Sequence, residues 1–248
     1  MQAVILAGGL ATRLGPLTEA IPKSMVRIGD RPFLEHQIEV LRENGIEDLL
    51  LCVSYLGKLI KGYFGDGERF GVRISYSFDG EKLLGTGGAL KKAESVLQDE
   101  FFLIYGDSYL IYDYQAIRRH FDESDKLSLL VVYRNEDRYD RSNVIIKEGM
   151  VKIYDKENRT EGMVHIDSGL SVLRKGALEL IPENCPSDLA DLYRELARQK
   201  EMLAYEVKER FYQIGSFEGL KEFENLITGG LYDSNQNTCQ DSPGGWGN

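Results

Sequence analysis

The sequence predicts an α/β fold, in which helices flank both faces of a mainly parallel sheet. Short apolar runs rich in branched residues alternate with segments of helical period through the first half of the chain. Glycine closes several of these runs, as in Leu6-Ala7-Gly8-Gly9 and Tyr105-Gly106. With 42% hydrophobic and 28% charged residues, the 248-residue chain has the composition of a globular protein with an ordinary core.

Each element of the first half is bounded by a turn residue or by a change of period. Residues 2–6 form an apolar run that stops before Gly8, as a buried strand does. Residues 33–44 keep a helical period as far as Gly45. Strands are predicted at residues 2–6, 48–53, 72–77, 101–105 and 127–133, and helices at residues 33–44, 56–64, 89–97 and 114–121.

The rhythm changes after about residue 135, where strands follow one another with little helix between them. We therefore expect a smaller mixed α/β lobe that packs on the first sheet. Residues 228–248 are rich in glycine, serine, asparagine and glutamine and lack periodicity, which predicts a flexible tail. Strands are predicted at residues 143–147, 151–154, 166–173, 203–207 and 211–214, and helices at residues 177–181, 188–199 and 217–227.

Charge and cysteine content argue against several classes of function. A net charge of −10 at pH 7 disfavours nucleic acid or an anionic membrane as a partner. The three cysteines, Cys52, Cys185 and Cys239, give neither a disulfide framework nor metal-ligand spacing, which fits a reducing compartment. The N-terminal apolar run lacks a basic flank and is too short for a signal peptide or a membrane span. We therefore expect a cytoplasmic protein.

A loop after the first predicted strand carries the strongest chemical signal. It runs for about fifteen residues, whereas roughly 2–6 are usual in such connections. Gly8 and Gly9 let the backbone approach a base or phosphate closely and expose N–H donors to it. Arg13 offers a planar fork for phosphate oxygens, and Lys23 offers a compact charge. The alternative is a surface loop with solvated basic residues.

Two further features lie beside predicted strands and helices. The turn Gly85-Thr86-Gly87-Gly88 enters a helix, where it presents N–H groups and the positive end of the helix dipole, or serves only as a tight turn. Asp107 follows a buried strand, where its carboxylate lies at the ligand edge of the sheet or caps a turn. The first turn lacks both G-x-G-x-x-G and the G-K-[ST] of a Walker A loop, which disfavours a dinucleotide-dependent oxidoreductase.

The run Gly8-Gly9-x-x-Thr12-Arg13-Leu14, extended by Pro16-Leu17-Thr18 and Pro22-Lys23, resembles the signature of sugar-1-phosphate nucleotidyltransferases. The resemblance covers about residues 1–227 and implies a single domain with a Rossmann-like, GT-A-like sheet and no β-helix domain. The reaction it implies is transfer of a nucleoside monophosphate from a nucleoside triphosphate to a sugar 1-phosphate, with release of pyrophosphate.

The resemblance assigns the nucleotide-binding part to residues 1–134. It makes Arg13 and Lys23 catalytic, in contact with phosphates of the two substrates, and it brings Gly88 nearest to the base. It makes Asp107 a ligand of Mg²⁺, the implied cofactor, which takes one or two carboxylates together with substrate phosphate oxygens. The nucleotide-binding residues that it implies are Leu6, Ala7, Gly8, Gly9, Thr12, Arg13, Tyr55, Gly85, Thr86, Gly88 and Asp107.

The sugar-phosphate-binding part is implied to be residues 135–227. There Lys156 resembles the family lysine that binds the sugar phosphate, although a charged, solvated face is the alternative. Asp167 and Gly169 resemble a segment that contacts sugar hydroxyls. His165 and Asp167 share one strand face, but no third metal ligand accompanies them.

Gln213 departs from the family pattern, which has an acid there as second metal ligand. A neutral amide is a poorer ligand for a hard cation. Three explanations stay open: a metal held by Asp107 and the phosphates, a weakened site, or a protein that has lost catalysis and kept binding. The last is a non-catalytic sugar-nucleotide-binding regulatory protein.

Among the branches of the family, the chain looks most like short guanylyltransferases. Ser54-Tyr55-Leu56 and Ile214-Gly215-Ser216 suggest GTP with D-glycero-D-manno-heptose 1-phosphate or mannose 1-phosphate as the partners. Glucose 1-phosphate with dTTP or UTP stays open. The chain has no hexapeptide repeat, and we expect a monomer or a small homo-oligomer.

Overall fold

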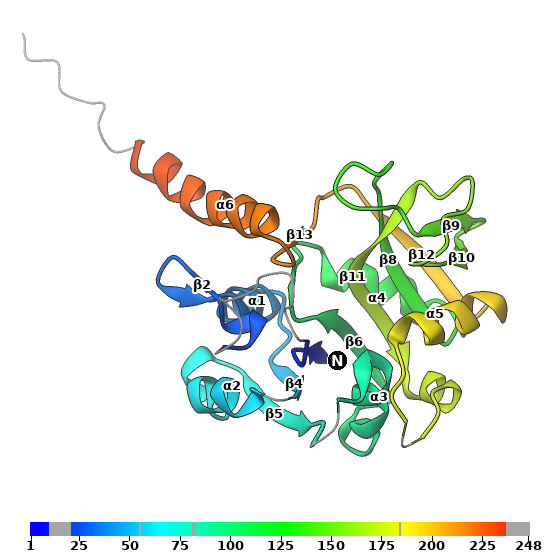
Figure 1. Ribbon diagram of the computed structural model, residues 1–248, viewed down its shortest axis with the longest axis horizontal. Helices are drawn as coiled ribbons and strands as arrows, with labels where there is room; N and C mark the ends of the chain where they lie inside the picture. Colours follow the sequence, from blue (N-terminus) through cyan, green and yellow to red (C-terminus); the bar gives the residue numbers. More distant parts are fainter. Residues whose placement is uncertain (10–20, 55, 81–82, 184, 237–248) are drawn as a thin grey trace, which may run out of the picture.

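The computed structural model describes residues 1–9, 21–54, 56–80, 83–183 and 185–236 (Figure 1). The strands of its main sheet are β1 (Gln2–Leu6), β4 (Asp48–Val53), β5 (Arg73–Phe78), β6 (Glu100–Tyr105), β8 (Ser128–Arg134), β9 (Val144–Lys147), β10 (Met150–Tyr154), β11 (His165–Arg174) and β12 (Met202–Val207). The sheet has nine strands in the order β5-β4-β1-β6-β11-β8-β12-β10-β9.

Helices cover both faces of this sheet (Figure 1), so the predicted α/β class is confirmed. Two short ribbons stand beside the sheet, one made of β2 (Arg27–Ile28) and β3 (Arg31–Pro32), the other of β7 (Ser108–Tyr109) and β13 (Tyr212–Gln213). The helices are α1 (Phe33–Glu43), α2 (Gly57–Phe64), α3 (Gly85–Lys92), α4 (Tyr114–Asp122), α5 (Leu189–Arg198) and α6 (Phe217–Gln236).

The central strand β1 is buried along its whole length, because it pairs in parallel with β4 and β6 and is covered on both faces. Ala3 and Ile5 face a core that also takes side chains from α1, α2 and α4. Val4 and Leu6 face a second core that takes side chains from α3 and α5. Each large apolar side chain buried in this way contributes about 1.5–3 kcal/mol to stability.

The second half of the chain extends the main sheet, whereas the sequence predicted a lobe packed on it. Strand β11 pairs antiparallel with β6, with Leu170 opposite Ile104, and β8 follows on its other side. The join is made by strand pairing between distant segments, which no local pattern specifies. As a result, the two halves meet along β6 and β11.

Two helix boundaries and one helix type differ by more than a residue or two from the sequence prediction. Helix α3 begins at Gly85, so the glycine-rich turn forms its first turn. Helix α6 continues past residue 227 to Gln236 and projects from the body (Figure 1). The segment Lys175–Leu180 is a 3₁₀ helix where an α-helix was expected. Boundaries depend on caps and packing more than on period, which explains these differences.

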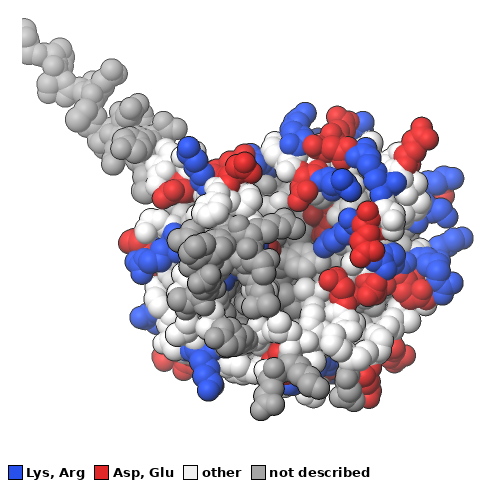
Figure 2. All heavy atoms as spheres, in the orientation of Figure 1, with Lys and Arg blue, Asp and Glu red and all other residues white. Residues whose placement is uncertain are grey.

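The distribution of surface charge and the apolarity of the helices agree with the composition of the chain. Figure 2 shows acidic and basic side chains interspersed over the face that Figure 1 presents. Within the described ranges, the structure contains no helix that is both long and apolar enough to cross a membrane. The carboxyl ends of β1, β4, β5 and β6 meet at one edge of the sheet, which is where open α/β sheets bind ligands.

Candidate active site

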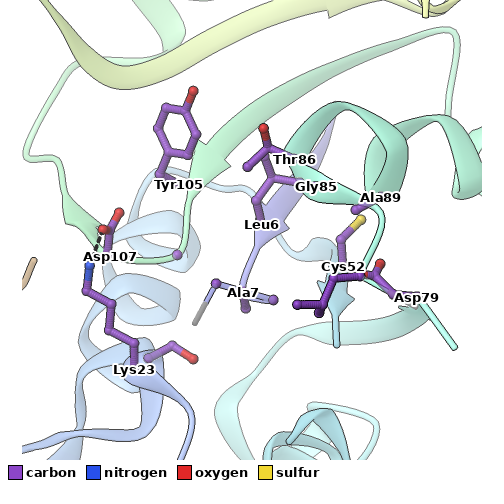
Figure 3. Close-up of a pocket in the computed structure, with 15 residues that line it drawn as sticks. Leu6, Ala7, Lys23, Cys52, Asp79, Gly85, Thr86, Ala89, Tyr105 and Asp107 are labelled. Carbon is purple, nitrogen blue, oxygen red and sulfur yellow. Dashed lines mark hydrogen bonds and ion pairs between the residues drawn. The ribbon is translucent and has the colours of Figure 1, made fainter. Parts of the chain in front are cut away.

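A cavity of about 330 Å³ opens at the carboxyl edge of the parallel strands (Figure 3). The segments that follow β1 and β4 stay hydrogen-bonded to each other beside this cavity. The Ala7 N–H donates to the Cys52 carbonyl at 2.8 Å, and the Ser54 hydroxyl donates to the Gly8 carbonyl at 2.5 Å. The predicted nucleotide-side residues that line this cavity are Leu6, Ala7, Gly8, Gly9, Lys23, Gly85, Thr86 and Asp107.

The glycine-rich turn acts differently from the sequence interpretation. The N–H groups of Gly87 and Gly88 donate to the Ser187 carbonyl oxygen at 3.0 and 3.3 Å, so they hold the chain before α5. A β-carbon on Gly85 would overlap that same oxygen, and the residue has a φ of +72°. Glycine is therefore needed here for close packing and for a left-handed backbone.

Gly88 is displaced from the role that the resemblance implied. A β-carbon on this residue would lie 3.1 Å from the Cys185 carbonyl oxygen, so Gly88 faces the segment before α5. Gly88 is absent from the lining of the 330 Å³ cavity, to which Leu83, Gly85 and Thr86 contribute. Gly88 belongs to the first turn of α3, which begins at Gly85.

Asp79 and Cys52 line one end of this cavity and were missed from the sequence. Figure 3 shows them opposite the end that holds Lys23 and Asp107. Burial raises the pKa of the Asp79 carboxyl above its ordinary value, against the hydrogen bond from the Leu84 backbone. Burial also raises the pKa of the Cys52 thiol to about 12, so the thiol stays protonated. The position of Asp79 just after β5 is the same signal that identified Asp107 after β6.

A second cavity, of about 730 Å³, adjoins the first. The residues implied to bind the sugar phosphate, Lys156, Asp167 and Gly169, line it together with Gln213, which stands at the position of the second metal ligand. A β-carbon on Gly169 would lie 2.5 Å from the Ser108 hydroxyl, and its φ is +94°, so this strand position requires glycine. Further lining residues that carried no recognised motif are Tyr139, Asp140, Arg141 and Asn143, from the segment between β8 and β9.

Lys23, Tyr105 and Asp107 line both cavities and form the wall between them. The Lys23 ammonium lies 2.5 Å from a carboxylate oxygen of Asp107, as the dashed line in Figure 3 marks. Both side chains are partly buried, with exposed fractions of 17% and 32%. The pair therefore brings a positive and a negative group to the point where ligands in the two cavities would meet.

The residues near this wall fit a magnesium ion that substrate phosphates help to hold. The Ile214 N–H donates to the Asp107 carbonyl at 3.0 Å, which ties β13 to β7 and brings the Gln213 amide to the same cavity. Among the described residues, no group of three or more histidine, cysteine, aspartate or glutamate side chains is placed to hold a metal. Magnesium typically takes one or two carboxylates, keeps several waters and binds substrate phosphates, which matches such an open set.

Residues near the predicted site have other partners. Asp155, which precedes Lys156, caps its own turn, since its carboxylate accepts hydrogen bonds from the backbone of Glu157 and Asn158 at 2.8 and 2.9 Å. His165 pairs with Glu206 at 3.3 Å. It belongs to no group of three or more potential metal ligands among the described residues. The predicted roles of Thr12, Arg13 and Tyr55 lie outside the described residues.

Comparison with known proteins gives a consistent result. The chain matches the family model for nucleotidyl transferases over residues 2–228. It is 38% identical over 176 residues to D-glycero-alpha-D-manno-heptose 1-phosphate guanylyltransferase from Campylobacter jejuni subsp. jejuni, covering 71% of this chain and 76% of that protein. It is 28% identical over 224 residues to mannose-1-phosphate guanyltransferase from Yarrowia lipolytica, covering 87% of this chain but only 61% of that protein.

A solved structure extends the likeness to three dimensions. The crystal structure of HddC from Yersinia pseudotuberculosis complexed with GMP-PN superposes with a TM-score of 0.74 at 27% identity, and the match covers 91% of this chain and 99% of that one. The matched family model spans the carboxyl edge, both cavities and the wall between them. The chain therefore belongs to the nucleotidyl transferase family.

Proposed function

We propose that the protein transfers a nucleoside monophosphate from a nucleoside triphosphate to a sugar 1-phosphate and releases pyrophosphate. The observation that carries the proposal is the wall formed by Lys23, Tyr105 and Asp107, which two adjoining cavities share. A triphosphate in the smaller cavity and a sugar phosphate in the larger one would bring their phosphates together at this wall. The names of the relatives describe the same reaction class.

The chemistry requires positioning and charge more than side-chain activation. A phosphate monoester has its second pKa near ~6, so the sugar phosphate is already a dianionic nucleophile at neutral pH. It attacks the α-phosphorus in line, and pyrophosphate leaves from the opposite side. The obstacle is repulsion between two polyanions. Fixed positive charge at the reacting centre lowers that barrier without any reorganisation during the reaction.

Each charged side chain at the wall and in the larger cavity has a separate role in binding and charge neutralisation. Lys23 neutralises charge at the reacting phosphates, and Lys156 holds the sugar phosphate in the larger cavity. Asp107 holds Lys23 and supplies the carboxylate ligand for Mg²⁺, with Gln213 beside it. When bound, Mg²⁺ supplies charge neutralisation at the phosphate oxygens. Arg13 has the charge and the fork geometry to bind the departing pyrophosphate.

The preferred nucleotide in this proposal is GTP. Asp79 lies at the end of the nucleotide cavity farthest from the Lys23–Asp107 pair, which is where the base of a bound nucleotide would lie (Figure 3). Guanine presents two adjacent donors, N1–H and the 2-amino group, to a carboxylate. Adenine presents an acceptor at N1, and uracil and thymine present a single N–H between two carbonyls. A half-buried carboxylate with a raised pKa gains most from the two donors of guanine.

Replacing Asp79 by asparagine tests this base assignment. The change keeps the shape but removes the charge, so kcat/KM for GTP should fall by about 10–100-fold, the worth of a hydrogen bond to a charged group. The values for other nucleoside triphosphates should stay within a factor of about three. The exposed Asp122→Asn change on α4 is the matched control. A wild type that prefers ATP or UTP, or an unchanged rate with GTP in the variant, contradicts the assignment.

The proposed acceptor is D-glycero-D-manno-heptose 1-phosphate, with mannose 1-phosphate next. The most informative relative is the heptose 1-phosphate guanylyltransferase, of which this chain covers 76%. The described cysteines Cys52 and Cys185 are unpaired, which supports a cytoplasmic site of action. We also propose a monomer or a small homo-oligomer.

The first measurement is pyrophosphate release with Mg²⁺, each common nucleoside triphosphate and a panel of hexose and heptose 1-phosphates. We expect release with GTP and one sugar phosphate. We also expect Gln213→Glu to lower the Mg²⁺ concentration for half-maximal rate by about tenfold, since a second carboxylate adds ligand charge.

Gln213 favours one other function, that of a non-catalytic sugar-nucleotide-binding regulatory protein. That function predicts that neither the wild type nor Gln213→Glu releases pyrophosphate, and that the protein binds a nucleotide sugar measurably. Release by Gln213→Glu alone would instead identify a transferase site disabled by the glutamine.

A further inference from the structure

The ammonium group of Lys156 is held at the edge of the larger cavity by three close contacts and a longer one, 5.8 Å from the centre of the Tyr154 ring. It lies 3.3 Å from the Tyr105 hydroxyl oxygen, to which it donates, and 4.8 Å from the centre of the Tyr105 ring. Its third contact is a carboxylate oxygen of Asp167 at 3.8 Å. The lysine side chain is still 41% exposed, so the held ammonium remains accessible from the cavity.

The Asp167 carboxylate is itself fixed by the core. It is 3% exposed, and one oxygen accepts from the Tyr154 hydroxyl at 2.9 Å while the other accepts from the Gly169 N–H at 2.8 Å. The Tyr154 ring packs edge-on against Tyr193 with centroids 5.2 Å apart. Asp167 therefore has little freedom to follow a moving lysine.

The backbone that carries Lys156 is fixed as well. The carboxylate of Asp155 accepts from the N–H groups of Glu157 and Asn158, which closes the turn immediately after β10. Lysine has several rotatable bonds and loses much rotamer freedom when a ligand immobilises it. A lysine whose backbone and ammonium are both held in place beforehand has lost most of that freedom before any phosphate arrives.

We propose that Tyr105 is a positioning residue, which with Asp167 holds the Lys156 ammonium ready for the phosphate of the sugar 1-phosphate. Tyr105 fits this task because it belongs to the wall shared by both cavities, and its ring and hydroxyl both face the lysine. The ring attracts the cation through its π face, and the hydroxyl oxygen accepts one of its hydrogen bonds. This inference rests on the proposed function, since Lys156 is the sugar-phosphate contact there.

The test is a double-mutant cycle on the KM for the sugar 1-phosphate. Tyr105→Phe keeps the ring and removes the acceptor, so KM should rise about threefold, whereas Tyr105→Leu removes both contacts and should raise it about tenfold or more. In a Lys156→Met background, Tyr105→Leu should add less than about twofold, because its effect passes through the lysine. Tyr76→Phe, which loses a hydroxyl that donates to the Gly65 carbonyl at 2.8 Å and lines neither cavity, is the control and should leave this KM unchanged.

The outcomes separate this inference from the proposed function. If the wild type releases no pyrophosphate with any substrate pair, the proposed function fails first. If the wild type is active but the KM of the double variant rises by the product of the two single-variant effects, Tyr105 does not act through Lys156 and the positioning role is wrong. An unchanged KM in Tyr105→Leu overturns it as well. Tyr105→Phe supplies the measurement should the leucine variant not fold, which thermal unfolding would reveal.

Discussion

Asparagine at position 107 should lower kcat by about 10²–10³-fold, the usual cost of losing one preorganised electrostatic group. Asp107 lines both cavities and pairs with the Lys23 ammonium at 2.5 Å. The amide removes the charge that orients Lys23, and it also removes the carboxylate ligand that Mg²⁺ prefers. The measurement is pyrophosphate release at saturating concentrations of both substrates, over a range of Mg²⁺ concentrations.

The Asp107→Asn variant should remain folded, which makes the result interpretable. The strand pairing next to it uses the Asp107 carbonyl, which accepts from the Ile214 N–H, and does not use the carboxylate. The midpoint of thermal unfolding should therefore shift by only a few degrees. The Asp122→Asn control on the exposed face of α4 should keep full activity. A kcat above about a third of the wild-type value would remove Asp107 from the reacting centre.

Methionine at position 23 should cost a similar 10²–10³-fold in kcat, because it removes positive charge from the wall between the substrates while keeping the length of the side chain. Lys23 lies on a short 3₁₀ helix that fixes its backbone beside the cavity. Arginine should restore little of the rate. A guanidinium spreads its charge over a planar fork, so it does not reproduce the compact ammonium that pairs with Asp107 at 2.5 Å.

The matched control is Lys58→Met, on the exposed face of α2, which should leave both kcat and KM unchanged. The way the Lys23→Met effect divides between kcat and KM also tests the mechanism. A lower kcat with little change in KM means that Lys23 acts in the transition state. If only the KM for the nucleotide rises, Lys23 is a ground-state binding residue and the proposed role is wrong.

The candidate site was partly predictable because its residues follow buried strands. Asp107 comes two residues after the end of β6, and Gly8 comes two residues after the end of β1, where the carboxyl ends of parallel strands must meet. Asp79 obeys the same rule after β5 but has no motif around it, so it was overlooked. Arg141, on the segment between β8 and β9, lines the larger cavity without any local sign in the sequence.

The class of fold and the family could both be predicted from sequence patterns alone. Buried parallel strands need continuous apolar runs, and the helices between them need a 3.6-residue period. Both patterns can be recognised within a short stretch of sequence. The antiparallel placement of β11 beside β6 is a tertiary feature, because strand pairing between distant segments depends on the fit of whole surfaces. This pairing brings Asp167 to Tyr105, while the placement of β10 beside β12 and β9 brings Lys156 to the same point, and together they join the two halves of the candidate site.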